Sequence, residues 1–423
     1  AGSGGAALGA GARAMARRSA SARLALRRAA GGVGTLRAAG HNRTGGRQRG
    51  ERLKTLVTGG AGFVGSHLVD SLLEAGHDVR ILDNLDPQVH GAERQPPDYL
   101  NPKAELQVGD VRDRDAVSRA MEDVDVVYHQ AAAVGVGQSM YEIERYVSVN
   151  SVGAAVVLEE AIARRDQLRR LIVASSMSIY GEGAYRDAQG AACYPGLRSE
   201  EALARRAFEC RGPDGSELTP EPTPESKPLQ PTSIYAVTKR DHEEMFLSVG
   251  AAYGIPTVAL RYFNIYGTRQ SLSNPYTGVM AIFSSRLLNQ NPPVIFEDGA
   301  QTRDFVNVAD IVQANLLALE GERAVGGVYN IGTGQPTSVA RIAEVLAERL
   351  DFGEPAQITG EFRAGDIRHC YADISRARAD LGFEPKVGLE AGMDELLSWL
   401  RGQRPDDRVA AATQELKKRG LAR

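Results

Sequence analysis

The chain has 423 residues, of which 43% are hydrophobic and 24% charged, and its net charge is −3. This composition is ordinary for a globular protein, and the length suits one large α/β domain with a smaller one appended. No stretch approaches the roughly 20 consecutive apolar residues of a membrane span, so we expect no membrane association. The three cysteines are too scattered for a disulfide framework or a zinc site. We therefore expect no metal and a reducing, cytoplasmic compartment.

Residues 1–50 differ in composition from the rest of the chain. They hold ten arginines and no acidic residue, and they lack apolar periodicity, so we expect a disordered tail over residues 1–52. Three interpretations are open: a transit peptide, a twin-arginine signal at Arg17-Arg18, or an idle stretch translated from upstream of the natural start, which we favour. The remaining chain is acidic, which argues against a general nucleic-acid surface.

From Leu53 onward, short β-rich runs alternate with helical patterns. Val64, Leu68 and Leu72 recur at helical spacing after the first run, and Gly76 is well placed to end that helix. Strands alternating with helices imply right-handed crossovers and a parallel, doubly wound (Rossmann) α/β sheet. The strands expected in this sheet lie at residues 55–58, 79–82, 106–108, 124–128, 171–174 and 258–260.

Two segments depart from this alternation. Residues 182–231 are rich in proline, glycine and charge, and we expect a long surface insertion between a strand and the next helix. Beyond residue 265 the strands become shorter, as at 294–296 and 328–331, which predicts a smaller second lobe. The expected divisions are a nucleotide-binding domain at 53–265 that contains this insertion, a region at 266–400 that is mainly a substrate-binding lobe, and a charged tail at 401–423.

The turn after the first strand is rich in glycine. Glycines allow a tight turn and let the backbone approach a diphosphate, while the next helix offers free N–H groups and a positive dipole end. Because a strand precedes the motif and a helix follows it, the motif predicts a dinucleotide site. The residues expected to contact the dinucleotide are Gly59, Gly62, Phe63, Val64 and Gly65.

Acidic residues after the second and third strands indicate which dinucleotide is bound. Asp83 ends the second strand, where a carboxylate accepts hydrogen bonds from the ribose of NAD and repels the 2′-phosphate of NADP. We therefore expect the cofactor to be NAD, and we expect Asn84, the residue after Asp83, to contact it as well. Asp110 and Val111 follow the third strand and are expected near the adenine, although acids after strands also serve as caps.

Tyr235 and Lys239 are four residues apart at the start of a helical pattern, on one face. A nearby ammonium favours the phenolate of a tyrosine and brings its pKa toward working pH, which suits a general base. Ser176 lies just past the fifth strand, where its hydroxyl can bind the reacting oxygen beside Tyr235. The spacing alone also fits a solvated helix face, but after a dinucleotide motif it predicts catalytic groups.

These motifs resemble those of the extended short-chain dehydrogenases/reductases, in their NAD-dependent epimerase/dehydratase group. The resemblance covers about residues 53–400 and implies that Tyr235 is the general base, Lys239 its electrostatic partner and Ser176 a hydrogen-bonding helper. The segments that carry it are 58–65, 131–133, 175–181, 235–239, 261–264 and 303–306.

The resemblance also implies binding residues. Ala131, Ala132 and Ala133 would line the cofactor, and Asn264 would touch the diphosphate of the substrate. Arg303 and Arg363 match positions that grip the phosphates, and guanidinium groups fit phosphate oxygens. A surface ion pair, such as Arg303 with Asp304, is the alternative for either arginine.

The two residues that follow Ser176 indicate which reaction of this family to expect. In 4,6-dehydratases of this family an Asp-Glu pair stands there and moves protons during loss of water, whereas this chain has Met177 and Ser178. We therefore expect C4 epimerisation of a nucleotide-diphosphate sugar through a transient 4-keto sugar. Residues 84–91, 269–276 and the insertion resemble those of bacterial enzymes that epimerise dTDP-L-rhamnose.

Other functions stay open at this point. They are a UDP-glucose/UDP-galactose type of 4-epimerase, a 4-keto-sugar reductase that consumes NADH or NADPH, and a non-catalytic dinucleotide sensor or scaffold on the same fold. A sensor would have no need of Ser176, Tyr235 and Lys239 together. The resemblance also implies a homodimer, formed through helices that include the one carrying Tyr235.

Overall fold

The computed structural model describes residues 51–363 and 365–423, so the tail expected at 1–52 lies almost wholly outside the described residues. Within them, a seven-stranded parallel sheet has the order β13-β9-β5-β4-β1-β2-β3, which confirms the predicted doubly wound α/β fold. Its strands are β1 Lys54–Thr58, β2 Asp78–Asp83, β3 Glu105–Val108, β4 Val126–His129, β5 Arg170–Ser176, β9 Thr257–Tyr262 and β13 Val328–Ile331.

The central strands are buried on both faces, which explains why their sequences lack an alternating polar pattern. Their register brings the carboxyl ends together: Thr58 pairs with His129, and Ser176 pairs with Tyr262. The loops after β1, β2, β4 and β5 therefore open at one edge of the sheet, where ligands of doubly wound folds bind.

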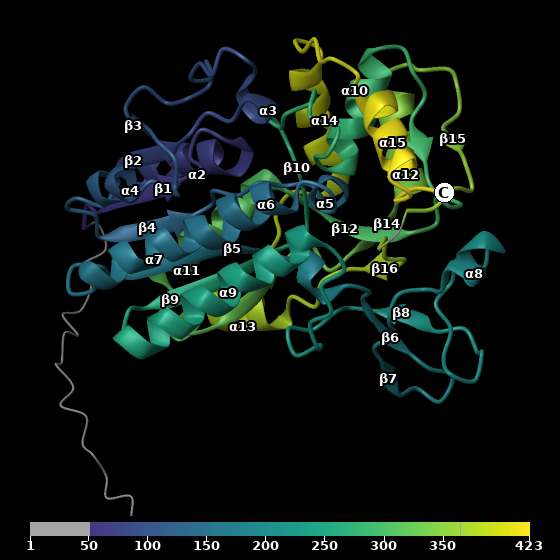
Figure 1. Cartoon of the computed structure of the whole chain (residues 1–423), viewed down its shortest axis with the longest axis horizontal. Coiled ribbons are helices and arrows are strands. Elements are labelled where there is room, and N and C mark those ends of the chain that lie inside the picture. Colours follow the sequence, from purple (N-terminus) through teal and green to yellow (C-terminus); the bar gives the residue numbers. More distant parts are fainter. Residues whose placement is uncertain (1–50, 364) are drawn as a thin grey trace, which may run out of the picture. The chain divides into compact units, whose positions relative to one another are not determined.

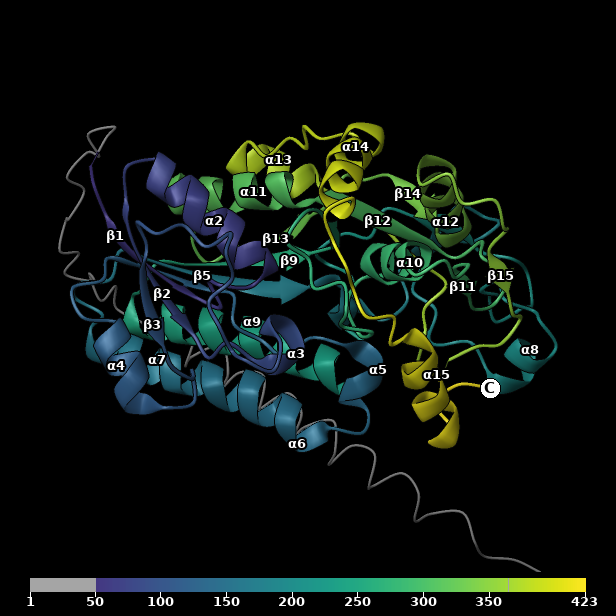
Figure 2. The ribbon, with the colours of Figure 1, turned by 90° about the horizontal axis from the view of Figure 1, so that it is seen from above.

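Helices cover both faces of the sheet. Figure 2 shows α2, α11 and α13 on one face and α4, α7 and α9 on the other. Each layer buries an apolar cluster against the strands, represented by Leu68 and Ile311 on one face and by Val157 and Phe246 on the other. The bounds are α2 Phe63–Glu74, α4 Arg114–Ala120, α7 Gly153–Ala163, α9 Ile234–Tyr253, α11 Val308–Glu320 and α13 Ser375–Leu381.

A smaller lobe lies beyond the carboxyl edge, with Phe283, Ile342 and Leu396 in its core. It is built from α10 Val279–Leu288, α12 Val339–Arg349, α14 Leu389–Leu400 and the short strands β10 Asn264–Tyr266, β11 Val294–Ile295, β12 Thr302–Asn307, β14 Pro336–Ser338, β15 Gln357–Ile358 and β16 His369–Cys370. The assignment of residues 328–331 to this lobe was wrong, because this strand, β13, pairs with β9 at the edge of the central sheet. A short apolar run does not indicate which sheet it joins.

Residues 182–231 lie between β5 and α9 and contain α8 Glu200–Ala204 and the antiparallel strands β6 Ala184–Arg186, β7 Ala192–Cys193 and β8 Thr219–Glu221 (Figure 1). This insertion is anchored to the smaller lobe. Arg198 donates to both carboxylate oxygens of Glu297 at 2.8 Å, and both side chains are nearly fully buried. Glu182 accepts the backbone N–H groups of Arg368 and His369.

The C-terminal residues 401–423, expected as a charged tail, include the helix α15 Val409–Lys418. Val409, Ala412 and Leu416 recur at helical spacing, and Ala412 and Leu416 are buried. Charged residues of this segment also contact the rest of the chain, since Asp407 pairs with Arg286 at 3.2 Å, Lys417 pairs with Glu361 and Arg419 lies over the ring of Tyr141.

Helix α9 is fixed on the sheet by a buried carboxylate. Glu243 accepts hydrogen bonds from Arg261 Nε at 2.8 Å and Nη2 at 2.5 Å, and from Ser175 Oγ at 2.7 Å. Arg261 belongs to β9 and Ser175 to β5, so Glu243 ties the helix to two neighbouring strands. Arg261 also donates to the hydroxyl of Tyr180 at 2.6 Å.

We predict that Glu243→Gln lowers the free energy of unfolding by about 3–5 kcal/mol, because it leaves the buried Arg261 guanidinium without a counter-charge. The neighbouring Glu244 is exposed and pairs with Arg240, so Glu244→Gln should cost about 0.5 kcal/mol or less. Urea denaturation measures both changes. Equal losses in the two variants would contradict the anchoring role of Glu243.

Candidate active site

The carboxyl edge of the sheet and the smaller lobe line a cavity of about 650 Å³, a size typical of small-molecule sites. Its lining includes every site residue expected from the sequence except Asp110. Loops after β1, β2, β4 and β5 supply the dinucleotide side, and α9 with the smaller lobe supplies the rest. Residues from distant parts of the sequence therefore meet at one site.

The glycine turn between β1 and α2 fits the diphosphate of a dinucleotide. Gly59 has φ +71°, and a Cβ atom there would lie 2.8 Å from the backbone of Ala131, while one on Gly65 would collide with the carbonyl oxygen of Gly59. Gly62 caps α2 without a side-chain hydrogen bond, and the first turn of α2 holds no acidic residue. The N–H groups of this turn are thus free to bind an anion.

Asp83 is fixed at the end of β2. Its carboxylate accepts the backbone N–H groups of Ala61 at 3.0 Å and Leu85 at 2.9 Å, and the residue lines the cavity. A carboxylate has further lone pairs for a ribose hydroxyl. Ribose binding by Asp83 stays a prediction, and the structure adds that the same carboxylate shapes the glycine turn.

Asp110 is not among the residues that line the cavity, and its contact with the adenine stays a prediction. Its carboxylate is bound by Arg112 at 2.8 and 2.9 Å and by Asn84 Nδ2 at 3.0 Å. The hydrogen bond from Arg112 is the main reason that the pKa of Asp110 falls to about 2. Gly109 and Val111, its neighbours in sequence, line the cavity instead. Asp110 thus orients Asn84 and the loop rather than facing the cavity.

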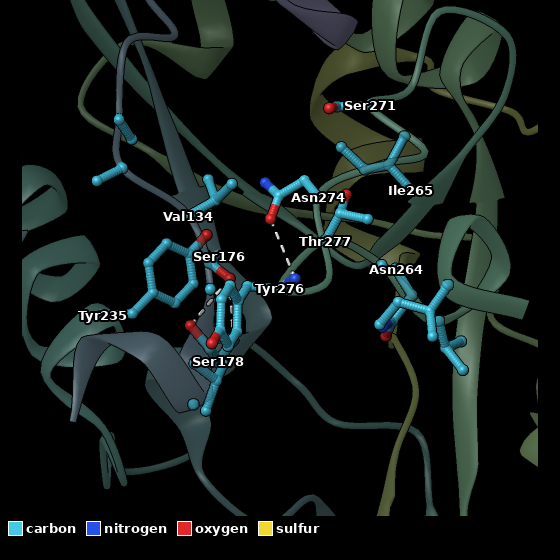
Figure 3. A pocket seen from close by; sticks show the side chains of 18 of the residues that line it. Val134, Ser176, Ser178, Tyr235, Asn264, Ile265, Ser271, Asn274, Tyr276 and Thr277 are labelled. Carbon is cyan, nitrogen blue, oxygen red and sulfur yellow. Dashed lines mark hydrogen bonds between the residues drawn. The ribbon is translucent and has the colours of Figure 1, made fainter. Parts of the chain in front are cut away.

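Ser176 and Tyr235 meet at one end of the cavity, where Figure 3 shows them beside Ser178. Ser176 ends β5 and accepts hydrogen bonds from Ser178 Oγ at 2.9 Å and Ser178 N at 3.2 Å. Tyr235 stands in the first turn of α9, and its backbone N–H donates to Ser139 Oγ at 3.0 Å. Burial raises the pKa of Tyr235, and a hydrogen bond with Ser176 opposes that rise.

Lys239 is held by the backbone of β5. Its ammonium donates to the carbonyl oxygen of Ala174 at 2.9 Å, and His242 Nδ1 lies 3.5 Å away. Burial lowers the pKa of Lys239 to about 7. No direct hydrogen bond joins Lys239 to Tyr235 in the described structure, so any influence of Lys239 on the phenol is electrostatic or passes through a bound ligand.

Asn264 and Arg363 line the substrate side of the cavity, and they differ in how well their polar groups are satisfied. Asn264 Oδ1 is buried and has no hydrogen-bond partner among the described residues, which is costly unless a ligand supplies one. Arg363 Nε pairs with Asp366 Oδ2 at 2.8 Å, and the guanidinium lies over the ring of Phe296 at 4.6 Å.

Arg303 also lines the cavity, but it is not an ion-pair partner of Asp304. Its guanidinium donates to the backbone carbonyls of Thr302, Ile367 and Arg368. The buried carboxylate of Asp304 is instead satisfied by backbone N–H groups, including that of Thr333 at 2.8 Å. Among the described residues no carboxylate forms an ion pair with Arg303, so its guanidinium at the cavity wall suits an anionic substrate.

Several lining residues were not expected from the sequence. Asn274 Oδ1 accepts the backbone N–H of Tyr276 at 3.0 Å, the dashed line at Asn274 in Figure 3. The same oxygen accepts Gln88 Nε2 at 3.0 Å, which joins the two domains. Val134 also lines the cavity, as does α15 from the C-terminal segment. The polar run at 269–276 is the signal that could have identified Asn274 and Tyr276.

Comparison with known proteins shows to which family this chain belongs. Residues 55–332 match the NAD dependent epimerase/dehydratase family. The chain belongs to this family. The dTDP-L-rhamnose 4-epimerase of Burkholderia thailandensis is 36% identical over 82% of this chain and 94% of that protein. A putative UDP-glucose 4-epimerase of Methanocaldococcus jannaschii is 34% identical over 82% of this chain and 98% of that protein.

Solved structures of the family share the fold. The UDP-glucose 4-epimerase of Thermotoga maritima with UDP-glucose has a TM-score of 0.67 at 31% identity, covering 82% of this chain and 99% of that one. The UDP-glucuronic acid 4-epimerase of Bacillus cereus, in complex with UDP-glucuronic acid and NAD, has a TM-score of 0.65 at 28% identity over 82% and 99%. Membership of this family confirms the expected NAD dependence.

We predict that Lys239 makes stability depend on pH. Above pH 7 the folded chain releases the proton of Lys239, whereas an unfolded lysine keeps it to a pKa of about 10.4. Unfolding then takes up a proton, so stability rises with pH. Between pH 7 and 9 cofactor-free wild type should gain about 2 kcal/mol relative to Lys239→Met.

Denaturation by urea at several pH values measures this gain. The exposed Lys417 is the control, and Lys417→Met should follow the wild-type profile. Parallel profiles of wild type and Lys239→Met would contradict a lowered pKa at Lys239.

Proposed function

We propose that the protein is an NAD-dependent 4-epimerase of a nucleotide-diphosphate sugar, with dTDP-L-rhamnose as substrate. The observation that carries this proposal is the placement of Ser176, Tyr235 and Lys239 in the same cavity as the glycine turn. The names of the relatives, which act on dTDP-L-rhamnose and on UDP-sugars, support it. A cytoplasmic setting is part of the proposal, and free cysteines in the described structure suit a reducing compartment.

NAD, when held by the glycine turn and Asp83, would supply the acceptor and later the donor of the hydride at C4 of the sugar. Tyr235 accepts the proton of the C4 hydroxyl as the hydride leaves, so that a ketone forms. Ser176 donates a hydrogen bond to the same oxygen and holds it beside Tyr235. The ketone turns in the cavity, and Tyr235 returns the proton when the hydride arrives on the opposite face. Since NAD is regenerated in each cycle, it should stay bound.

The residues after Ser176 support epimerisation over dehydration. Met177 and Ser178 both line the cavity, at the positions where the family's dehydratases carry acidic groups. Neither side chain can exchange a proton with a sugar near neutral pH. The bound 4-keto sugar is therefore expected to be reduced again rather than to lose water.

We predict that Tyr235→Phe lowers kcat by about 10²–10⁴-fold, because the proton of the C4 hydroxyl loses its acceptor. NAD should remain bound, since the glycine turn is unchanged. Turnover is measured by following the products formed from dTDP-L-rhamnose and from UDP-glucose by NMR, without added cofactor. The amount of NAD that stays bound is measured after denaturation of the purified protein.

Tyr253, exposed at the end of the same helix, gives the matched control Tyr253→Phe, which should keep wild-type activity. Unchanged turnover in Tyr235→Phe would remove Tyr235 from the mechanism. Turnover that requires added NADH and a 4-keto sugar would identify a reductase instead of an epimerase.

We also propose that the protein forms a homodimer. The helical run 143–163 contains α6 Ile143–Tyr146, the π-helical turn η1 Val147–Val152 and α7, and it packs against α9. By composition this run is apolar and long enough to cross a membrane. Its outer side exposes Ile143, Val147 and Val152, and Val237 of α9 is exposed as well. A second copy of this surface is a suitable partner for these apolar side chains.

We predict that Val147→Glu weakens this homodimer, because it buries a charge in an apolar interface. Light scattering coupled to size-exclusion chromatography should show a dimer for wild type and a shift to monomer for the variant. Val108 is exposed on the edge strand β3, and Val108→Glu should remain dimeric. A monomeric wild type would contradict the proposal.

A further inference from the structure

The C-terminal segment forms one wall of the cavity. Val409, Ala412, Thr413 and Leu416 of α15, and Leu421 beyond it, line the cavity together with the sheet edge and the smaller lobe. Their spacing places them along one side of the helix, and the exposed Ala411 lies on the other side. The segment thus contributes to the site although it carries none of the motifs of the catalytic domain.

The chain end is attached to the segment that carries Arg363. The backbone N–H groups of Phe362 and Arg423 each donate to the carbonyl of the other residue, at 2.8 and 2.9 Å. Lys417 Nζ donates to Glu361 Oε1 at 2.6 Å. These bonds hold α15 at the substrate side of the cavity.

The side of α15 that carries Leu416 also contacts α5 Val136–Ser139, and Figure 2 shows the two helices next to each other. A Cβ atom on Gly137 would lie 3.3 Å from Leu416, and the guanidinium of Arg419 lies 4.2 Å from the ring centre of Tyr141. Helix α5 adjoins the reacting end, because Ser139 Oγ accepts the backbone N–H of Tyr235. The wall therefore extends from Arg363 to the neighbourhood of the catalytic tyrosine.

The surface that α5 and α15 present to the cavity is apolar. Val134, Val136 and Met140 line the cavity and are 42%, 41% and 38% exposed, and Ala412 and Leu416 line it from α15. Charged side chains of α15 form ion pairs elsewhere, as Lys417 does with Glu361 and Arg419 with Glu415. A methyl group bound here gains by leaving water, whereas a hydroxymethyl or carboxylate group loses hydrogen bonds to water without replacement.

We propose that α15 is a specificity element of the sugar site, and that Ala412 and Leu416 select a 6-deoxysugar, whose C5 substituent is a methyl group. The proposal rests on the proposed epimerase function, which places C4 at Tyr235 and hence C5 beside it. An apolar wall discriminates only moderately against an added hydroxyl group, by about 10- to 100-fold in kcat/KM.

The test compares dTDP-L-rhamnose with dTDP-L-mannose, which differ only in the hydroxyl group on C6. Epimerisation of each is followed by NMR in wild type, Ala412→Gln and the matched control Ala411→Gln, with purified full-length protein. We expect wild type to prefer the deoxysugar in kcat/KM by about 10-fold or more. Ala412→Gln should bring this ratio toward unity, because its amide can bind the C6 hydroxyl, and Ala411→Gln should keep the wild-type ratio.

A second variant guards against misfolding of Ala412→Gln. Leu416→Ala shortens the side chain without adding any group. It should also reduce the ratio of kcat/KM for dTDP-L-rhamnose over dTDP-L-mannose, because less apolar surface remains to contact the methyl group on C5. An unchanged ratio in both Ala412→Gln and Leu416→Ala, or an equal change in Ala411→Gln, would overturn the role of α15.

The experiment distinguishes failure of this inference from failure of the proposed epimerase function. A wild type that epimerises UDP-glucose, but does not prefer dTDP-L-rhamnose over dTDP-L-mannose, would overturn this inference and leave the epimerase function standing. A wild type that epimerises none of these sugars would contradict the epimerase function itself.

Discussion

The buried contact between Glu243, Arg261 and Ser175 fixes the helix that carries the reacting residues. Desolvation offsets much of the attraction in such a pair, so its main effect is to specify position, since any shift of α9 would leave a charge unpaired. With Glu243 anchored, Lys239 reaches the carbonyl oxygen of Ala174 and Tyr235 reaches Ser176. Three consecutive residues of β5, Ala174, Ser175 and Ser176, thus fix the position and orientation of α9 on the sheet.

Burial favours the neutral form of both Tyr235 and Lys239, the two groups that we propose as catalytic. It raises the pKa of Tyr235 and lowers that of Lys239, so the protein alone favours the neutral forms. The histidines behind Lys239 add no positive charge, because burial lowers the pKa of His129 to about 3 and that of His242 as well. If Tyr235 acts as the proposed base, its ionisation would be favoured by positive charge that a ligand brings into the cavity.

The substrate side of the cavity is built from several chain segments, because the chain crosses between the central sheet and the smaller lobe more than once. The chain passes from the smaller lobe back into the central sheet at β13, returns to the lobe, and ends with α15 against Phe362 and α5. The insertion is joined to the same lobe by the buried pair of Arg198 and Glu297. Each of these contacts joins residues far apart in sequence, so together they place the arginines and the apolar wall relative to Tyr235.

The sequence by itself determined the local features: the strands, the glycine turn and the spacing of Tyr235 and Lys239. These follow from the geometry of a few consecutive residues, in which chain spacing decides which side chains share a turn or a face. Only the tertiary structure decided that Asp110 binds Arg112 and Asn84 rather than facing the cavity, that Val328–Ile331 completes the central sheet and that the C-terminal helix lines the site. Such outcomes depend on which distant partner satisfies a carboxylate, a strand edge or an apolar face, and that choice is made by long-range packing.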